Sequence, residues 1–281
     1  DHMPPPVPPV GDYRGHSTVP LDGETKDYSG RPTQVPGKHP IGLGIRTPTM
    51  VISPWSRGGN VCSQLFDHTS VIRLVEERFG VKEPNISAWR RSVCGDLTST
   101  LDFNAADKSD PHLDYSVTQD FKTRNAVSKA APDFSLPDNQ QVATQHGGRK
   151  SHRPLPYRFE SETSVIPQVG LRIAFYNRGP VGVAFTVHDN LDIEEPWHFT
   201  IGAGDSHVAQ DWSPGRVADR YDLTLRGPNG YWRHFAGLLG PEAAGVEANL
   251  IENRATGAIE LHLANGSAAP VRFRAAMEEG V

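Results

Sequence analysis

Two Asp-His pairs beside loop-forming residues are the first candidates for chemistry in this sequence. Asp67-His68 follows the loop SRGGNVCSQLF and precedes an amphipathic stretch, and Asp1-His2 precedes the run MPPPVPPV. A histidine in the first turn of a helix has its cationic form disfavoured by the helix dipole, so its imidazole stays neutral for proton transfer. We therefore take His2, Asp67 and His68 as candidate catalytic residues. The structural alternatives are a helix cap at Asp67 and a frayed terminus at His2.

The loop before the second pair supplies the candidate substrate-binding residues. Arg57 precedes Gly58-Gly59, which resembles a phosphate cradle but lacks the spacing of a P-loop. Trp55 could present its ring to a quaternary ammonium group, or could be a core residue. Scattered histidines later in the chain have no metal-ligand spacing, and we expect surface or turn positions for His188, His198, His207, His234 and His262.

The region before residue 111 predicts strand and helix elements that would position these side chains. Residues 1–40 are rich in Pro and Gly and predict an extended surface loop. The continuous apolar run Met50–Ile52 predicts a strand buried on both faces of a parallel sheet, opening into the loop at Trp55. Helical spacing of apolar residues predicts a helix that starts at Asp67 or Thr69 and ends at Gly80. A second short helix is predicted in SAWRRSVCG, with its Ser as cap.

From residue 155 the apolar residues alternate with a period of two. Seven runs predict the strands of a small Greek-key sandwich: PYRFES, GLRIAFYN, VGVAFTVHD, WHFTIGAG, HVAQDW, RYDLTLRG and GYWRHFAG. The pattern then restarts in VEANLIE, GAIELHLAN and PVRFRAA and stops after three strands. We therefore expect the C-terminal part of an α/β layered domain in 1–110, a linker or irregular excursion with one short helix in 111–152, a β-sandwich in 153–240, and a truncated second repeat in 241–281.

Composition excludes some functional classes. The 28 Lys and Arg residues are balanced by 33 Asp and Glu residues, so an electrostatic nucleic-acid binder is not expected. No apolar run approaches the roughly 20 residues that span a bilayer.

The two cysteines, Cys62 and Cys94, predict either two buried thiols or one disulfide. The sequence shows no signal peptide and no methionine at position 1, and we expect a chain cut at both ends.

Several stretches together resemble the bacterial phosphocholine-preferring phospholipase C family, within the wider phosphoesterase and acid-phosphatase group. They are DHMPPPVPP, STVPLDGE, IGLGIRTPTMVISPWSRGG and FDHTSVIRLVEERFGVKEPNISAWRRSVCGDLTSTLDF, which run almost continuously from Asp1 to Phe103. The β region from residue 155 resembles the paired C-terminal domains of the same enzymes.

The resemblance implies the C-terminal part of an alkaline-phosphatase-like α/β catalytic domain, followed by β-sandwich modules of which the last is incomplete. The implied reaction is hydrolysis of phosphatidylcholine, or sphingomyelin, to phosphocholine and diacylglycerol or ceramide by an exported protein, secreted or periplasmic. The divalent metal of the complete enzyme would be bound upstream of Asp1, with none in this chain alone. The expected partners are phospholipid or a membrane surface and the missing N-terminal portion, without which the chain would be inactive.

Two alternatives remain at this point. One is a non-catalytic β module that binds lipid or a partner protein. The other is an acid phosphatase that acts on phosphomonoesters.

Overall fold

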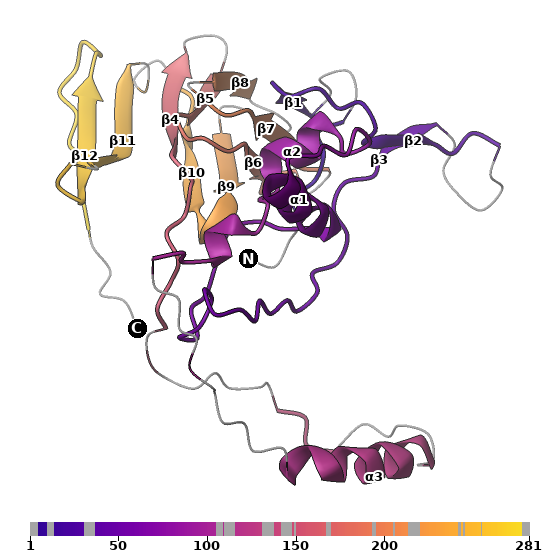
Figure 1. Cartoon of the computed structure of the whole chain (residues 1–281). Coiled ribbons are helices and arrows are strands. Elements are labelled where there is room, and N and C mark those ends of the chain that lie inside the picture. Colours follow the sequence, from indigo (N-terminus) through magenta and orange to yellow (C-terminus); the bar gives the residue numbers. More distant parts are fainter. Residues whose placement is uncertain are drawn as a thin grey trace. The chain divides into compact units, whose positions relative to one another are not determined.

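The computed structural model describes residues 5–9, 14–30, 37–104, 109, 116–130, 138–141, 148, 150–166, 170–192, 195–204, 206–212, 220–240, 243, 245–253 and 255–276 (Figure 1). The chain divides into two compact units. One comprises residues 1–50, 62–100 and 153–281, and the other residues 51–61 and 101–152. Each unit is described by itself.

The first 40 residues contain strands where we predicted only an extended surface loop. Strand β1 (Gly15–Ser17) pairs in parallel with β7 (Trp197–Ile201), and β2 (Thr25–Asp27) pairs antiparallel with β3 (Lys38–Pro40). Val7 and Glu24 are buried. A Cβ on Gly15 would lie 1.9 Å from the His198 carbonyl oxygen, so only glycine allows this approach of the chain to β7. The Pro-rich and Gly-rich composition therefore did not indicate that residues 15–17 form a strand by pairing with β7.

Both predicted helices are confirmed. Helix α1 (His68–Phe79) begins after Asp67, whose side chain accepts from the Thr69 N–H while Ser70 bonds back to the Asp67 N–H. It ends at Gly80, which has the left-handed conformation with φ 68°. Helix α2 (Ala88–Val93) is capped by Ser87 and is followed by the short 3-10 turn η1 (Thr98–Thr100).

The predicted buried strand at Met50–Ile52 is wrong. These residues have no regular secondary structure, and the side chains of Met50 and Ile52 are 85% and 91% exposed. An apolar run indicates that side chains favour burial. A strand forms only when a neighbouring strand also pairs with its backbone N–H and C=O groups. No described strand pairs with this segment.

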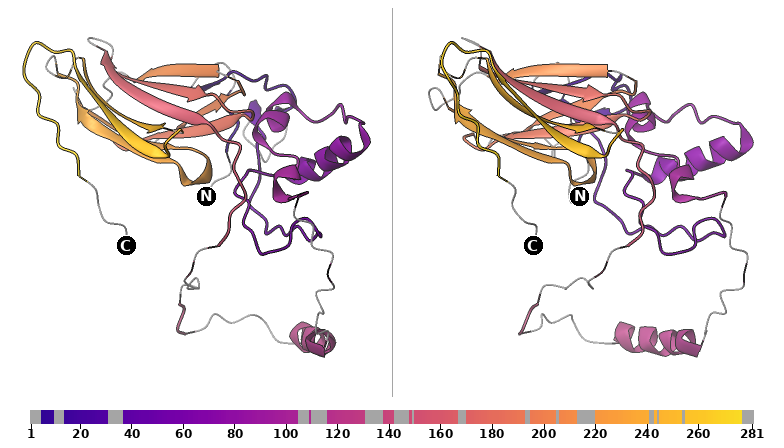
Figure 2. Two further views of the ribbon diagram at one scale, coloured as in Figure 1. Left: turned by 60° about the vertical axis from the view of Figure 1, so that its left-hand side comes forward. Right: turned by 90° about the vertical axis from the view of Figure 1, so that its left-hand side faces the viewer.

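The seven strands predicted after residue 155 are all present. They are β4 (Phe159–Ile166), β5 (Gly170–Asn177), β6 (Val183–Asp189), β7, β8 (Ser206–Trp212), β9 (Arg220–Arg226) and β10 (Trp232–Leu238), with the short turn η2 (Pro228–Gly230) before β10. One sheet has the order β1-β7-β6-β9-β10 and the other β4-β5-β8. The turned views show these strands in stacked layers (Figure 2).

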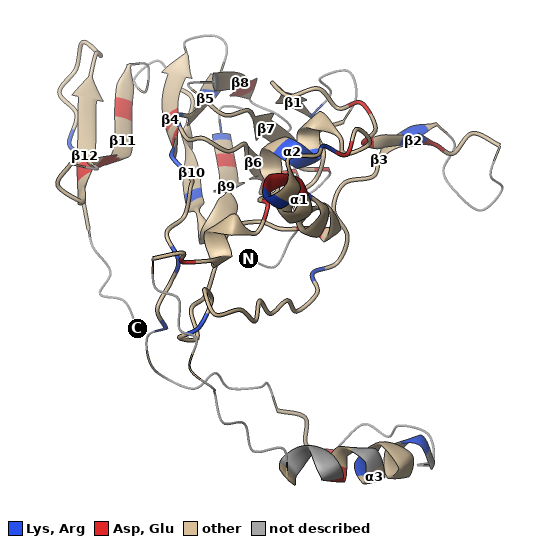
Figure 3. Ribbon diagram, in the orientation of Figure 1, with Lys and Arg blue, Asp and Glu red and all other residues tan. Residues whose placement is uncertain are grey.

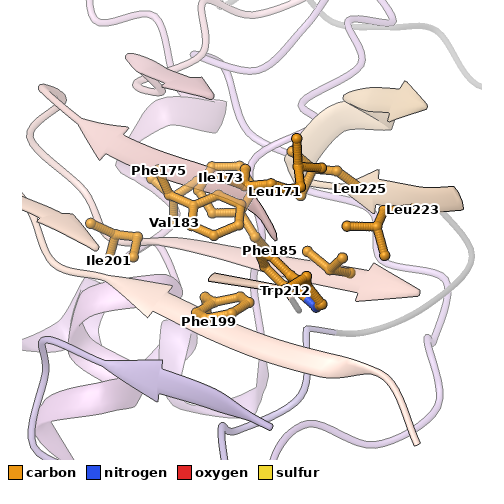
Figure 4. Packing of buried hydrophobic residues seen from close by; sticks show 11 residues of the cluster. Leu171, Ile173, Phe175, Val183, Phe185, Phe199, Ile201, Trp212, Leu223 and Leu225 are labelled. Atoms are coloured by element: carbon orange, nitrogen blue, oxygen red, sulfur yellow. The ribbon is translucent and has the colours of Figure 1, made fainter. Parts of the chain in front are cut away.

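One apolar core lies between residues of these two sheets (Figure 4). Its members alternate along each strand, as the period of two requires: Leu171, Ile173, Phe175, Val183, Phe185, Val187, Phe199, Ile201, Trp212, Leu223 and Leu225. Phe175 of β5 lies 4.7 Å from Phe199 of β7 and 5.1 Å from Phe185 of β6, measured between ring centroids. Aromatic contacts therefore join the sheets at the centre of the core.

The last predicted strand, in PVRFRAA, is not formed. Strands β11 (Val246–Asn253) and β12 (Ala258–Asn265) make a two-stranded antiparallel hairpin, whereas residues 270–276 have no regular structure. The Thr163 N–H of β4 donates to Asn249 Oδ1 at 3.0 Å, which ties the hairpin to β4. On β12 the side chains of Ile259, Leu261 and Leu263 are exposed. This strand therefore offers little buried apolar surface against which residues 270–276 could pack.

The other unit contains α3 (Ser116–Ala130), in the segment where we expected one short helix. Phe121 and Val127 are exposed on this helix. None of the helices in the described part of the chain combines the length and the apolar character that crossing a bilayer requires.

Removing a ring from the shared core should destabilise the protein strongly. Phe199→Ala should lower the free energy of unfolding by about 3–5 kcal/mol, because the cavity is not refilled. The control Phe121→Ala, on exposed α3, should change it by less than about 0.5 kcal/mol. Denaturant titration of both variants measures the difference, and similar effects for the two would contradict the assigned core.

The stability of the β region should also depend on His198. Burial, and then the nearby His188, lower the pKa of His198 to about 4. In the unfolded chain the pKa is about 6.5, so between about pH 6.5 and 4 only the unfolded chain binds this proton. As the pH is lowered through this range, the free energy of unfolding should therefore fall by up to about 1.4 kcal/mol per pH unit. His198→Gln should flatten that dependence in pH-resolved denaturant titrations. The same change at exposed His207 should leave it unaltered.

Candidate functional site

Asp67 and His68 lie together at the start of α1, where the sequence placed them. Asp67 Oδ1 accepts hydrogen bonds from the N–H and the hydroxyl of Thr69, and Oδ2 accepts from Arg90 Nη1 at 2.7 Å. Both carboxylate oxygens are therefore engaged in holding the helix start. The side chain of His68 is exposed beside this cap.

Arg90 is the centre of a buried ionic cluster that the sequence did not reveal. Its Nε and Nη2 donate to the two carboxylate oxygens of Glu24 at 2.8 and 3.1 Å, and Nη2 also donates to the Gly42 carbonyl at 2.7 Å. Glu24 is 1% exposed and accepts a further hydrogen bond from the Ser87 hydroxyl. Although burial by itself lowers the pKa of Arg90, the two carboxylates raise it above its ordinary value. We call Glu24, Asp67 and Arg90 the ionic cluster.

A second ion pair fixes the far end of α1. Arg91 Nη1 and Nη2 donate to the two carboxylate oxygens of Glu76 at 2.8 and 2.7 Å. These bonds, together with the Glu83 N–H, lower the pKa of Glu76 to about 2. Arg73 also donates to the Cys94 carbonyl. Acidic and basic residues thus lie close together on α1 and α2 (Figure 3).

Buried apolar residues lie beside this polar junction. Val7, Trp89, Val93 and Cys94 form a compact buried cluster. Cys62 and Cys94 are both free thiols, so the disulfide alternative is wrong for this structure. Burial raises the pKa of the Cys94 thiol, which makes it a structural rather than a reactive group.

Trp55 and Arg57 belong to the other compact unit. The Trp55 ring is 37% exposed and lies 5.8 Å from the Phe103 ring, and its carbonyl accepts from the Asp102 N–H. Arg57 Nη1 donates to the carbonyl and hydroxyl of Ser109 at 2.6 and 3.0 Å. Trp55 and Arg57 are two positions apart in one short loop, and each contacts a residue of the segment after Leu101. His2 lies outside the described residues.

The other histidines are not all surface residues as predicted. His198 is half-buried on β7, and its Nδ1 lies 3.3 Å from the Thr186 hydroxyl. His234 Nε2 lies 2.8 Å from Asp222 Oδ1, which also accepts from the Asn190 amide. The bonds from Asn190 and His234 lower the pKa of Asp222. These contacts join strands of the β region and complete its outer surface.

The described residues contain no group of three or more His, Cys, Asp or Glu side chains placed to hold a metal ion. The described residues alone therefore do not fit a metal of the kind that the resemblance implies.

Comparison with known proteins gives family matches in two separate segments of the sequence. The model of the phosphoesterase family matches residues 1–82, and that of the bacterial phospholipase C C-terminal domain matches residues 151–238. The non-hemolytic phospholipase C of Burkholderia pseudomallei is 37% identical over 97% of this chain and 39% of its own length. Both parts of the chain are therefore similar to bacterial phospholipases C.

Two proteins of Pseudomonas aeruginosa are similar to this chain as well. Its non-hemolytic phospholipase C is 38% identical over 97% of this chain and 40% of its own length, and its hemolytic phospholipase C is 34% identical over 85% and 35%. The chain thus spans about two fifths of the length of these relatives or less.

Breaking the ionic cluster should be costly because Glu24 is buried. Arg90→Met should lower the free energy of unfolding by about 3–5 kcal/mol, since it leaves an uncompensated buried carboxylate. The matched control is Arg172→Met, which removes the exposed ion pair with Asp211 and should cost at most about 1 kcal/mol. Adding Glu24→Gln to Arg90→Met should recover part of the loss. Equal, small effects of both arginine changes in denaturant titration would contradict this assignment.

Proposed function

We propose that this chain is the C-terminal part of a phospholipase C that cleaves the phosphodiester of phosphatidylcholine, or sphingomyelin, and releases phosphocholine. The proposal is carried by the 37% identity to a non-hemolytic phospholipase C over 97% of the chain. A similarity that includes both the helical part and the β region argues against a β module that acts without the phosphoesterase part.

In this proposal His68 is the proton donor. Water, or a hydroxyl group outside this chain that water later displaces, forms the new bond to phosphorus as the bond to the diacylglycerol oxygen breaks. The leaving oxygen takes a proton from the protonated imidazole. Support comes from the exposed ring of His68 at the first position of α1 and from the rigid anchoring of that helix start. Asp67 keeps both carboxylate oxygens on Thr69 and Arg90, so its part is to position His68. His2 remains a further candidate for the same site.

Trp55 and Arg57 are proposed to bind the head group. The Trp55 ring, which is tilted by 51° against the Phe103 ring, would offer a π face to the quaternary ammonium group of choline. Arg57 carries five donor groups in a planar fork, which suits the phosphate of the same head group. Their place in one short loop is consistent with contacts to adjacent parts of a single ligand.

The finer architecture is proposed on the same basis. The sheets β1-β7-β6-β9-β10 and β4-β5-β8 would form a β-sandwich module, with β11 and β12 starting a second repeat in 241–281. Residues 1–110 would belong to an alkaline-phosphatase-like α/β domain, and 111–152 would be the linker. The divalent metal would be bound by a part of the enzyme outside this chain. The protein would be exported, secreted or periplasmic, and would act at a phospholipid surface.

The role of His68 can be measured as phosphocholine release from phosphatidylcholine vesicles. The assay combines this chain with a polypeptide carrying the part of the Burkholderia pseudomallei relative that the chain does not match. His68→Ala should lower kcat at least tenfold, about 1.4 kcal/mol in the barrier. The matched control His262→Ala, at an exposed position of β12, should retain full activity.

Other outcomes would change the proposal in defined ways. Equal activity of the two histidine variants would remove His68 from the chemistry. Hydrolysis of p-nitrophenyl phosphate without release of phosphocholine would favour the acid phosphatase. Full turnover by the chain alone would show that it carries a complete site.

A further inference from the structure

Helix α1 directs much of its polar surface toward the protein and much of its apolar surface outward. Ser70 is fully buried, Arg73 donates to the Cys94 carbonyl, and Glu76 is bound by Arg91. On the opposite side, four large apolar side chains are 44–68% exposed: Val71, Ile72, Val75 and Phe79. Leu74, on the inner side, is half-buried. A surface helix of a complete globular domain has the reverse arrangement.

Ionic contacts fix this orientation of α1, so the helix cannot turn about its axis without breaking them. The start of the helix is tied to Arg90 through Asp67, and Glu76 is tied to Arg91 two turns later. Turning the apolar side inward would break both ion pairs and the capping box. The exposed stripe is therefore a built feature of the fold.

The stripe has the geometry of a packing ridge. Val71, Val75 and Phe79 follow each other at intervals of four residues, so they form one continuous row along the helix, with Ile72 beside it. β-branched side chains have few rotamers and lose little freedom when they pack. Such a row fits the groove between side chains of another helix or of a sheet.

A second uncovered segment lies in the same compact unit. Ile41, Ile45 and Met50 are 50%, 95% and 85% exposed along a segment without regular structure. A helix and an extended segment that are both apolar and both uncovered indicate an absent layer of secondary structure. The relatives contain more than half of their length outside the match to this chain.

We propose that the outward row of α1 (Val71, Ile72, Val75 and Phe79) is the docking surface for the region of phospholipase C sequence that lies outside this chain's match to its relatives. This inference rests on the proposed function for the identity of the occupant. The same contact would place His68, at the start of the helix, beside that region.

The composition of α1 disfavours the other occupants. The two arginines of α1, Arg73 and Arg78, are balanced in charge by Glu76 and Glu77. Arg73 and Glu76 already bind other groups of the protein, the Cys94 carbonyl and Arg91. A helix that binds a lipid surface instead presents a Lys- and Arg-rich polar face to the head groups. A second copy would meet this chain over one face of a helix about 18 Å long, which is small for a stable homodimer.

The test is binding of the chain to the unmatched region of the Burkholderia pseudomallei relative, co-expressed as a separate polypeptide. The two should co-purify as a one-to-one complex by size-exclusion chromatography with light scattering. Val75→Asp and Val71→Asp should each weaken binding at least tenfold, because a charge would be buried in the contact. The matched control Val127→Asp, on exposed α3, should bind as the unchanged chain does.

Every outcome is decisive for the docking surface. Co-purification that both α1 variants leave intact would overturn the proposal, as would two soluble polypeptides that do not associate. If the partner polypeptide is insoluble alone, co-expression with the chain should make it soluble, and failure to do so overturns the proposal. A chain that forms dimers sensitive to Val75→Asp, or that binds phosphatidylcholine vesicles through this row, also overturns it. A complex that forms without releasing phosphocholine supports the docking surface and counts against the proposed function alone.

Discussion

The guanidinium of Arg90, held between two carboxylates, is the interaction on which the arrangement of the helical part depends. It joins Glu24, the Gly42 carbonyl and Asp67, which are far apart in sequence. Buried charges are tolerated only when their hydrogen bonds are satisfied, and the cluster satisfies them with the help of the Ser87 hydroxyl. Because Asp67 is also the cap of α1, the same contact sets the direction of that helix and leaves its apolar row outward.

The helical part and the β region are tied together by a few contacts within one compact unit. Trp89 Nε1 donates to the Thr200 hydroxyl at 2.9 Å, and both side chains are fully buried. The Gly182 N–H donates to the Ser92 carbonyl, where a Cβ on Gly182 would lie 2.0 Å from the Ser92 hydroxyl. Strand β1 also extends the sheet of the β region. The pairing of β1 with β7 therefore joins the start of the segment matched by the phosphoesterase model to the segment matched by the C-terminal domain model.

Local patterns predicted the elements well and their partners poorly. The caps at Asp67 and Gly80 and the strands after residue 155 depend on neighbouring residues and on periodicity, so the sequence contains their signals. The cluster of Glu24 and Arg90 depends on residues 66 positions apart, for which no local signal exists. The run at Met50–Ile52 signalled apolar burial, but no described strand supplies the partner. The candidate loop at Trp55 and Arg57 was predictable as a loop, whereas its substrate contacts remain a proposal.

Hydrogen–deuterium exchange of the Arg90→Met variant tests most directly whether this guanidinium orders the helical part. The account predicts faster exchange in residues 68–79 and 38–42, with unchanged protection in the core strands β5 and β6, because the loss is local to the segments that Arg90 joins. Unchanged exchange in α1, or an equal loss of protection in the helices and the core strands, would contradict it.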